Sequence, residues 1–444
     1  MPRTYWIETL GCPKNQVDSD KLVGTFVADG MTPADSPSAA DLVVVNTCAF
    51  IEAARQESID VVLALAEDAP EAELVVTGCM AERYGDELSD ALPEVDVVAG
   101  FGSAFVPVHA AAHDAVPVTI GRAAQDRVPQ FDLLNLPRPA SVAPWAYLKV
   151  AEGCDRACGF CAIPSFRGPQ RSRTMADLVD EADDLDVREI VLVAQDLAAY
   201  GRDQGRGERS LVPLVEHLTS MVDRVRLLYL YPSDLTDELI AAILATDVPY
   251  FDLSLQHVSP PLMRSMRRWG DGERFLNRID AIRAARPDAV FRSNFIVGYP
   301  GETEDDHVAL VEFVEAAQLD WCGLFTYSEE VGTYAADLAD KVPAGLARER
   351  LDEVSALQDA ITASRRDRLV GVRTDVLIDA PGVGRTWREA PEIDGVVLLD
   401  ESLPVGAIVE ATITESLGTD LRAEPVGEPM PWVRRVAPVD EVGA

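Results

Sequence analysis

The sequence contains no long hydrophobic run. No segment approaches the ~20 consecutive apolar residues that a membrane-spanning helix requires. The opening segment, MPRTYWIETLGC, also lacks the basic and apolar regions of a signal peptide. We therefore expect a cytoplasmic protein with no membrane partner. Hydrophobic residues make up 48% and charged residues 26% of the 444 residues, a balance typical of a globular protein with more than one domain.

Positive charge is scarce. The chain has 39 Lys and Arg against 75 Asp and Glu, which gives a formal net charge of −36. Because such a surface repels phosphate, we do not expect nucleic acid as the substrate. The segment from residue 370 to 444 is also acidic, with fourteen Asp and Glu, six Arg and a net charge of −8. A basic protein partner matches this charge, although an acidic surface that only maintains solubility would give the same numbers.

Histidine is scarce too, and the seven cysteines cannot all pair. The most specific motif is Cys154-Asp-Arg-Ala-Cys158-Gly-Phe-Cys161, directly after a predicted strand. Three thiolates at this spacing can bind three irons of a 4Fe–4S cluster and leave the fourth iron open to another ligand. Zinc is the alternative, but a closed zinc site needs further ligands, and the five histidines form no pair near these cysteines.

Three more cysteines, Cys12, Cys48 and Cys79, each lie just past a predicted parallel strand. Because parallel strands end at one edge of a sheet, the three thiols are expected to meet there. The pattern predicts a second three-cysteine 4Fe–4S site, with zinc or three separately buried cysteines as the alternatives. Cys322 follows Trp321 in an apolar strand and is interpreted as a core residue.

The order of predicted elements indicates an α/β protein with three domains. A βαβ rhythm over the first segment predicts an open parallel sheet, and six further strands separated by helical segments predict an open (β/α)6 barrel, a partial TIM barrel. A long charged helix then leads to period-two alternation, as in Val409, Ala411 and Ile413, which predicts a small β-barrel resembling an oligonucleotide-binding fold. The predicted domains are 1–125, 143–365 and 366–436, with a proline-rich linker at 126–142.

The central motif matches the radical S-adenosylmethionine (SAM) superfamily, which also favours an aromatic residue such as Phe160 before the last cysteine. The segment Phe295-Ile-Val-Gly-Tyr-Pro-Gly-Glu302 resembles the strand and turn that this superfamily places beside the adenine of SAM. Ala194-Gln-Asp196 ends the second barrel strand, where the superfamily contacts the methionine or ribose part. The resemblance implies SAM contacts at Gln195, Asp196, Ile296 and Gly298.

With both cysteine triplets placed, the whole chain resembles the methylthiotransferase family, which joins a three-cysteine domain, a radical SAM barrel and a C-terminal β-barrel called TRAM. The stretches Leu10-Gly-Cys-Pro-Lys-Asn15 and Cys161-Ala-Ile-Pro-Ser-Phe-Arg-Gly168 are similar to the branch that modifies an aspartate of a ribosomal protein. The stretch Arg385-Thr-Trp-Arg-Glu-Ala-Pro-Glu-Ile-Asp-Gly395 also matches the family. Ser254 and Asn294 depart from the commoner proline and threonine.

This resemblance implies that the chain adds a methylthio group to the β-carbon of an aspartate in the twelfth small-subunit ribosomal protein. It implies two SAM molecules, two 4Fe–4S clusters, an electron donor such as flavodoxin or ferredoxin, and a sulfur donor. No acid or base residue is expected to act as a catalyst, because the chemistry takes place at the clusters. A closed cavity between two domains is expected, and Tyr327 and the stretch Arg167–Arg173 are candidates to line it, with packing or surface roles as the alternative.

Two other functions remain open from the sequence. One is methylthiolation of an adenosine in transfer RNA, which would use the same clusters on a different substrate. The other is a protein that does not catalyse and keeps its clusters for redox sensing or structure, with the β-barrel binding RNA. Cleavage of SAM to 5′-deoxyadenosine separates this last class from both enzymes.

Overall fold

The computed structural model describes residues 2–101, 132–205 and 210–433. Its amino-terminal part is a sheet of five parallel strands in the order β2-β1-β3-β4-β5. The apolar, β-branched run of β3 is buried along its whole length, as expected for a central strand covered on both faces. The elements are β1 (Thr4–Thr9), α1 (Pro13–Ala28), β2 (Thr32–Pro33), η1 (Pro37–Ala39), β3 (Leu42–Thr47), α2 (Glu52–Asp68), β4 (Glu73–Gly78), α3 (Cys79–Ala91) and β5 (Val97–Ala99).

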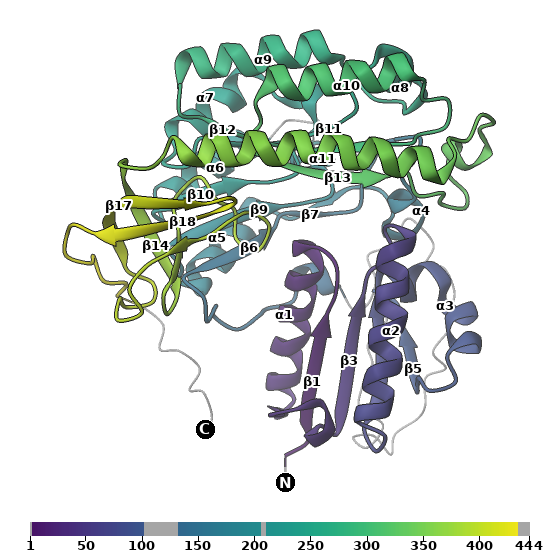
Figure 1. Cartoon of the computed structure of the whole chain (residues 1–444). Helices are drawn as coiled ribbons and strands as arrows, with labels where there is room; N and C mark the ends of the chain where they lie inside the picture. The colour runs from purple at the N-terminus through teal and green to yellow at the C-terminus, as the bar shows by residue number, and fades with distance from the viewer. Residues whose placement is uncertain (1, 102–131, 206–209, 434–444) are drawn as a thin grey trace.

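The helices of this domain divide between the two faces of the sheet. Leu22 and Phe26 of α1 pack on one face, together with Leu133 of a later segment. Helices α2 and α3 cover the other face through residues such as Val62 and Leu88. The arrangement is the open α/β sheet that the sequence predicts, with the carboxyl ends of its strands directed toward the rest of the chain (Figure 1).

The central part is an open barrel of six parallel strands. Backbone hydrogen bonds join β6, β9 and β10 in one sheet and β11, β12 and β13 in another, and a parallel bridge between Leu230 and Leu253 connects the two. The prediction of a six-stranded (β/α) barrel is thereby confirmed. The strands are β6 (Trp145–Lys149), β9 (Glu189–Val193), β10 (Arg224–Leu227), β11 (Tyr250–Gln256), β12 (Val290–Val297) and β13 (Trp321–Thr326).

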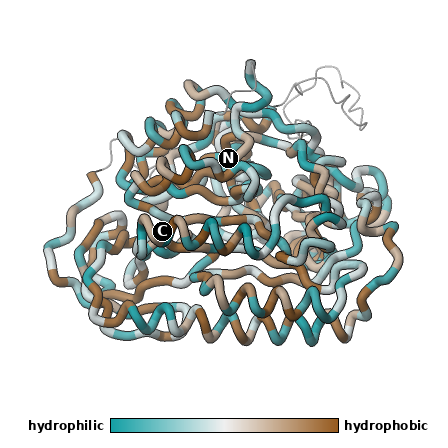
Figure 2. The backbone as a smooth tube through the Cα atoms, turned by 90° about the horizontal axis from the view of Figure 1, so that it is seen from above, coloured by the Kyte–Doolittle hydropathy of each residue, from teal (hydrophilic) through white to brown (hydrophobic). Residues whose placement is uncertain are grey.

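Helices surround this barrel, and α11 runs along its length toward the C-terminal domain (Figure 1). Hydrophobic and hydrophilic residues alternate along the helical turns in Figure 2, which is the pattern of helices with one face on a core. The longer helices are α5 (Met175–Leu185), α6 (Leu211–Thr219), α7 (Asp237–Ala245), α9 (Gly272–Ala285), α10 (Glu304–Ala317) and α11 (Ala344–Asp367). The short elements are η2 (Leu133–Asn135), β7 (Ala151–Glu152), α4 (Ile163–Arg167), β8 (Arg171–Ser172), η3 (Leu197–Ala199), η4 (Pro232–Asp234), α8 (Pro260–Ser265) and η5 (Tyr334–Asp337).

The C-terminal part is a closed five-stranded barrel in the order β14-β15-β16-β18-β17. Val409, Ala411 and Ile413 are buried in its core, as their alternation with polar residues predicts. The strands are β14 (Arg373–Ala380), β15 (Val383–Arg385), β16 (Val397–Leu398), β17 (Ile408–Leu417) and β18 (Asp420–Pro425). No described helix is both long and apolar enough to cross a membrane.

The segment between β15 and β16 fills the lumen of the central barrel at the amino ends of its strands. Ala390 packs there among Tyr147, Tyr250 and Trp321. The Trp321 indole donates to the carbonyl of Arg388 at 2.9 Å, and the Tyr250 hydroxyl donates to Asp394 at 2.6 Å. The stretch from Arg385 to Gly395, which resembles the methylthiotransferase family in sequence, therefore closes one end of the open barrel. The other end, where the strands finish, faces the amino-terminal domain.

The predicted domain boundaries stay predictions, and the one at residue 125 lies outside the described residues. The described part of the predicted linker packs against α1. Lys21 of α1 donates to the carbonyls of Leu134 and Leu136 at 3.0 and 2.7 Å. Arg138 pairs with Asp20 at 2.9 Å.

Candidate functional site

The amino-terminal cysteines lie at three strand ends of one sheet edge. Cys12 is the residue before α1, Cys48 directly follows β3, and Cys79 directly follows β4 as the first residue of α3. Gly11 allows the backbone before Cys12 to approach the Cys48 side chain closely. Its φ is +94°, and a Cβ at this position would lie 2.8 Å from the Cβ of Cys48. The structure therefore brings together the three thiols that the sequence predicted to meet.

The electrostatic environment of these thiols reflects how close they are to one another. Burial, together with negative charge on Cys12 and Cys79, raises the pKa of Cys48 to about 12. Burial also raises the pKa of Cys79. Burial acts on Cys12 in the same direction, but the nearby Lys14 and Arg167 outweigh it, so that the pKa of Cys12 lies below its ordinary value. Three ionised thiols would repel one another here unless positive charge, such as that of iron, lay between them.

Arg167 supplies positive charge to this group of thiols. Its Nη2 atom donates to the Cys79 Sγ atom at 3.0 Å and to the Asn15 Oδ1 atom at 2.7 Å. Its Nη1 atom donates to both carboxylate oxygens of Glu152, at 2.8 and 2.9 Å. The sequence indicated Arg167 only as one member of a basic stretch. Its contact with a thiol depends on two domains and has no local sequence signal.

The central cysteines come from one loop at the carboxyl end of the first barrel strand. Cys154 follows β7, and the loop continues through Cys158 to Cys161, just before α4. All three are half-buried. Burial, followed by the charges of Asp196 and Cys158, raises the pKa of Cys154 to about 11. Burial, together with the charges of the other two thiols of the loop, raises the pKa of Cys161 to about 12. The predicted triplet thus converges within a single loop.

Arginines also surround this loop. Arg268 donates from Nη1 to the Cys158 Sγ atom at 3.2 Å. Arg156, inside the motif, pairs with Asp196 at 2.5 Å and also with Asp234. The Tyr231 ring contacts both guanidinium groups, with centroid distances of 3.9 Å to Arg156 and 4.2 Å to Arg268. These contacts fix the loop. The sequence did not indicate Arg268 as a site residue, because it lies 107 positions after Cys161.

The predicted SAM-contacting residues lie on the ends of two barrel strands. Gln195 and Asp196 follow β9, and Gln195 donates to Glu152 at 2.8 Å. The Gln195 Oε1 and Asp196 Oδ1 atoms are buried and accept no hydrogen bond from the described residues. Two unpaired acceptors beside the central loop suit a ligand that carries an ammonium group or hydroxyl groups, as SAM does.

Ile296 and Gly298 lie at the end of β12. Ile296 and Phe160 of the cysteine loop pack against the same buried cluster, which includes Met266 and Tyr299, so the predicted adenine segment lies near the central motif. Gly298 has φ +76°, and a Cβ there would lie 2.6 Å from the Cβ of Ala347 in α11. This glycine is therefore explained by backbone conformation and helix packing. Contacts of all four residues with SAM stay a prediction.

Each cysteine triplet has the ligand type and number with which a protein can hold a 4Fe–4S cluster. In the described ranges, no three His, Cys, Asp or Glu side chains are grouped so that they could share one metal ion. A 4Fe–4S cluster makes a different demand, because each of its thiolate ligands binds a separate iron atom. Each triplet supplies three thiols, from three strand ends in one case and from a single loop in the other, and the chemistry of both donor sets therefore fits such a cluster.

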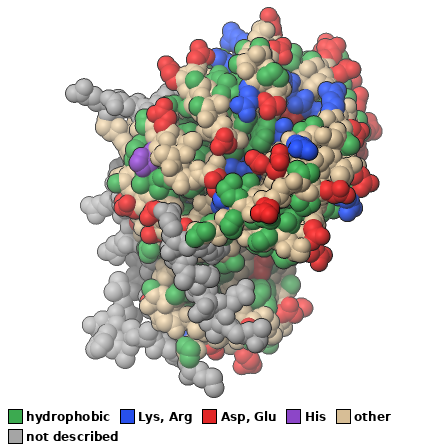
Figure 3. Space-filling model, turned by 90° about the vertical axis from the view of Figure 1, so that its left-hand side faces the viewer, with side chains coloured by type: hydrophobic (Ala, Val, Ile, Leu, Met, Phe, Trp, Pro, Cys, Tyr) green, Lys and Arg blue, Asp and Glu red, His purple; other side chains and the backbone are tan. Residues whose placement is uncertain are grey.

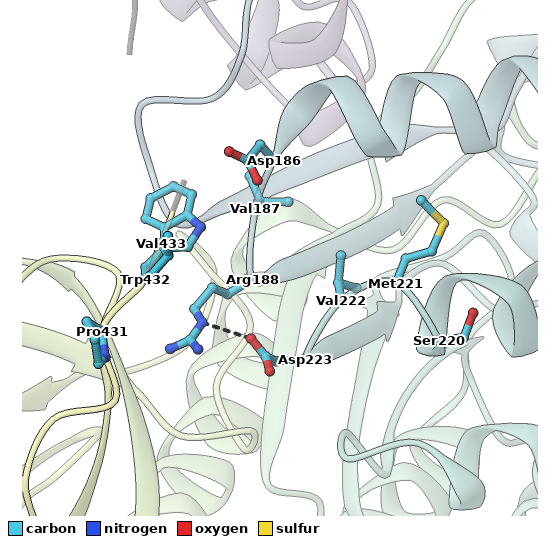
Figure 4. A pocket seen from close by; sticks show the side chains of 10 residues that line it. All are labelled: Asp186, Val187, Arg188, Ser220, Met221, Val222, Asp223, Pro431, Trp432 and Val433. Atoms are coloured by element: carbon cyan, nitrogen blue, oxygen red, sulfur yellow. Dashed lines mark ion pairs between the residues drawn. The ribbon is translucent and has the colours of Figure 1, made fainter. Parts of the chain in front are cut away.

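Two surface cavities lie away from the six cysteines of the two triplets. The larger, about 430 Å³, lies between the amino ends of barrel strands and residues 431–433 (Figure 4). Arg188 spans it, pairing with Asp223 at 2.8 Å and donating to the carbonyl of Met430 at 3.0 Å. A second cavity of about 290 Å³ borders Cys322, which packs against the barrel core as interpreted from the sequence.

Comparison with known proteins finds family matches in three parts of the chain. Residues 4–100 match the uncharacterized protein family UPF0004, residues 148–314 the Radical SAM superfamily, and residues 370–426 the TRAM domain. The chain is 41% identical to the ribosomal protein uS12 methylthiotransferase RimO of Streptomyces coelicolor, covering 96% of this chain and 97% of that protein.

Relatives from other bacteria are similar over the same extent. The proteins of the same name from Myxococcus xanthus and Aquifex aeolicus are 42% and 39% identical, covering 98% and 94% of this chain and 94% and 95% of their own lengths. Among solved structures, the radical SAM methyltransferase TsrM of Kitasatospora setae matches 90% of this chain and 79% of its own, at 14% identity and a TM-score of 0.48.

Proposed function

Because this chain belongs to the radical SAM methylthiotransferase family, we propose that it adds a methylthio group to the β-carbon of an aspartate in ribosomal protein uS12. The observation that carries the proposal is the similarity to uS12 methylthiotransferases, at 39–42% identity over more than 90% of both chains. We further propose that the reaction uses two SAM molecules and two 4Fe–4S clusters, one at each cysteine triplet. Cys154, Cys158 and Cys161 would hold one cluster, and Cys12, Cys48 and Cys79 the other.

When bound, the central cluster would supply the electron that cleaves SAM, and the amino-terminal cluster would supply the site from which sulfur is delivered. The residues of the chain orient and enclose these groups. Contacts of Arg156 with Tyr231 and Asp234 fix the cysteine loop. The unpaired acceptor atoms of Gln195 and Asp196 would orient SAM by accepting hydrogen bonds from it. Arg167, which lies shortly after Cys161, donates to Cys79 across the domain boundary, and this contact supports a substrate position between the two triplets.

Exclusion of water follows from how the two domains meet. Glu330, in the loop after β13, is buried and accepts from Arg55 and Arg83 of the amino-terminal domain, both at 2.6 Å. On the opposite side, Asp18 of α1 pairs with Lys149 of β6 at 2.6 Å. These buried ion pairs hold the amino-terminal domain over the barrel, where a carbon radical would have to be protected from other hydrogen donors.

The acidic C-terminal barrel supports a basic protein substrate. The 75 residues from 370 to 444 carry a net charge of −8, counted from fourteen Asp and Glu and six Arg. Acidic side chains are also spread over the face shown in Figure 3, with basic ones between them. Such a surface repels transfer RNA and attracts a basic ribosomal protein, mainly by raising the encounter rate and selectivity.

The test is anaerobic reconstitution with iron and sulfide, followed by reaction with SAM and a reductant in the presence of small ribosomal subunits or transfer RNA. We expect mass spectrometry to find one methylthio group on an aspartate of uS12 and none on RNA. A methylthio group on an adenosine instead would move the chain to the transfer-RNA branch. An electron donor of the flavodoxin or ferredoxin type and a cellular sulfur donor are proposed as partners, to be identified by whether they replace the chemical reagents.

A further inference from the structure

Arg167 crosses from one cysteine site to the other. It is the last residue of α4, the short helix that begins two residues after Cys161 of the central motif. Helix α4 packs against α3, whose first residue is Cys79 of the amino-terminal triplet. The loop that carries the central cysteines therefore also delivers a guanidinium group into the other site.

The guanidinium group of Arg167 has partners from both domains. It contacts Cys79 and Asn15 through one nitrogen and Glu152 through another, and the side chain is 3% exposed. Glu152 is fixed in turn by Lys149 and by Gln195, which donates to it at 2.8 Å. A planar fork with several donors can hold a sulfur and a carboxylate at once, which a lysine ammonium cannot do in the same geometry.

We propose that Arg167 is a positioning residue of the amino-terminal cluster, and that its hydrogen bond to the Cys79 sulfur raises the reduction potential of that cluster. The inference rests on the proposed function in one respect, namely that Cys12, Cys48 and Cys79 bind a cluster. Reduction adds a negative charge to the cluster and its sulfurs, and a buried positive donor stabilises the reduced state more than the oxidised state. Since the arginine stays protonated, this effect does not depend on pH near neutrality.

The measurement isolates the amino-terminal cluster in the full-length chain. Replacement of Cys154, Cys158 and Cys161 by alanine leaves one cluster, whose redox titration is followed by electron paramagnetic resonance at set potentials. In this background Arg167→Gln is expected to lower the ratio of reduced to oxidised cluster about tenfold at a fixed potential, which corresponds to about 59 mV for one electron. Arg167→Lys, which keeps the charge but loses the fork, is expected to give a smaller shift of the same sign.

Arg173→Gln is the matched control. Arg173 lies in the same basic stretch and is equally buried, but its partners are Glu181, Asn135 and backbone carbonyls. This variant should keep the potential of the parent chain. If it shifted the potential as much as Arg167→Gln, the effect would belong to any buried arginine and the proposal would be wrong.

Two further outcomes are decisive. An unchanged potential in Arg167→Gln, with a full complement of iron, would overturn the role of Arg167 while leaving the second cluster intact. Absence of iron from the background chain would instead overturn the second cluster of the proposed function, and the role of Arg167 with it. If Arg167→Gln does not fold, Arg167→Lys decides, because an unshifted potential in that variant would contradict the hydrogen-bond effect.

Discussion

The two cysteine triplets reach similar chemistry by different routes. The central triplet lies within eight consecutive residues, whereas the amino-terminal one joins three strand ends that are 36 and 31 positions apart. The central thiols are half-buried, while Cys48 and Cys79 are buried. Each triplet nevertheless receives one arginine donor from outside its own motif, Arg167 at Cys79 and Arg268 at Cys158. The comparison teaches that the thiols can be encoded locally or by topology, but the arginine side chains that donate to their sulfurs come from tertiary structure in both cases.

The largest expected difference between the triplets concerns which half of the reaction is lost. Cys154→Ala should abolish formation of 5′-deoxyadenosine, because the reductive cleavage of SAM is assigned to the central site. Cys12→Ala should keep that cleavage and lose methylthio transfer to uS12. Cys322→Ala is the control, since this thiol packs against the barrel core, outside both triplets, and its replacement should leave both products. Chromatography of 5′-deoxyadenosine and mass spectrometry of uS12 measure the two halves, and full transfer by Cys12→Ala would refute the division of roles.

Separating the two domains should uncouple the sites without removing either. Glu330→Gln leaves Arg55 and Arg83 without their buried carboxylate, and breaking such a pair costs roughly 3–5 kcal/mol. We expect the number of 5′-deoxyadenosine molecules formed per methylthio group to rise severalfold, because radicals would be quenched before sulfur arrives. Glu329→Gln is the neighbouring control, because its carboxylate is 59% exposed in a pair with Lys341. An unchanged ratio in Glu330→Gln would mean that this contact does not hold the sites together.

The two arginines should act on different clusters. In a chain that lacks Cys12, Cys48 and Cys79, Arg268→Gln should lower the potential of the central cluster, by less than Arg167→Gln does at the other site. The reason is that Arg268 is only half-buried and its contact is longer, at 3.2 Å, so that water screens the charge. Arg167→Gln should leave the central potential unchanged. If Arg167→Gln also shifted the reduction potential of the central cluster, the charge of Arg167 would act on both clusters and the two sites would not be electrostatically separate.

The smallest effect concerns the thiols of the protein without clusters. The lowered pKa of Cys12 means that its thiolate is populated at a pH where Cys48, with a pKa of about 12, remains protonated. Because the thiolate is the nucleophile, alkylation of Cys12 should rise and level off at lower pH than that of Cys48. Between pH 7 and 9 we expect Cys12 to react at least tenfold faster than Cys48, measured by mass spectrometry of labelled peptides. Equal rates would contradict the influence of Lys14 and Arg167.

Much of the fold follows from patterns that are local in the sequence. Each helix or strand with one buried face shows apolar residues at the spacing of its own backbone geometry. The alternation of Val409, Ala411 and Ile413 with polar residues is an example. The short strands β2, β5, β7 and β8 were not predicted, because two or three residues carry no period. The role of the segment from Arg385 to Gly395 was also not predictable, since filling the lumen of another domain leaves no local pattern.

The sequence by itself determined the three-part architecture, the two cysteine triplets and the resemblance to methylthiotransferases. These depend on spacing along the chain and on the rule that parallel strands end at one edge. Only the tertiary structure decided which distant charged groups meet: Arg167 at Cys79, Arg268 at Cys158, and Glu330 between Arg55 and Arg83. Such contacts join residues about 90 to 275 positions apart, and their energy depends on burial and direction, which exist only once the domains have packed.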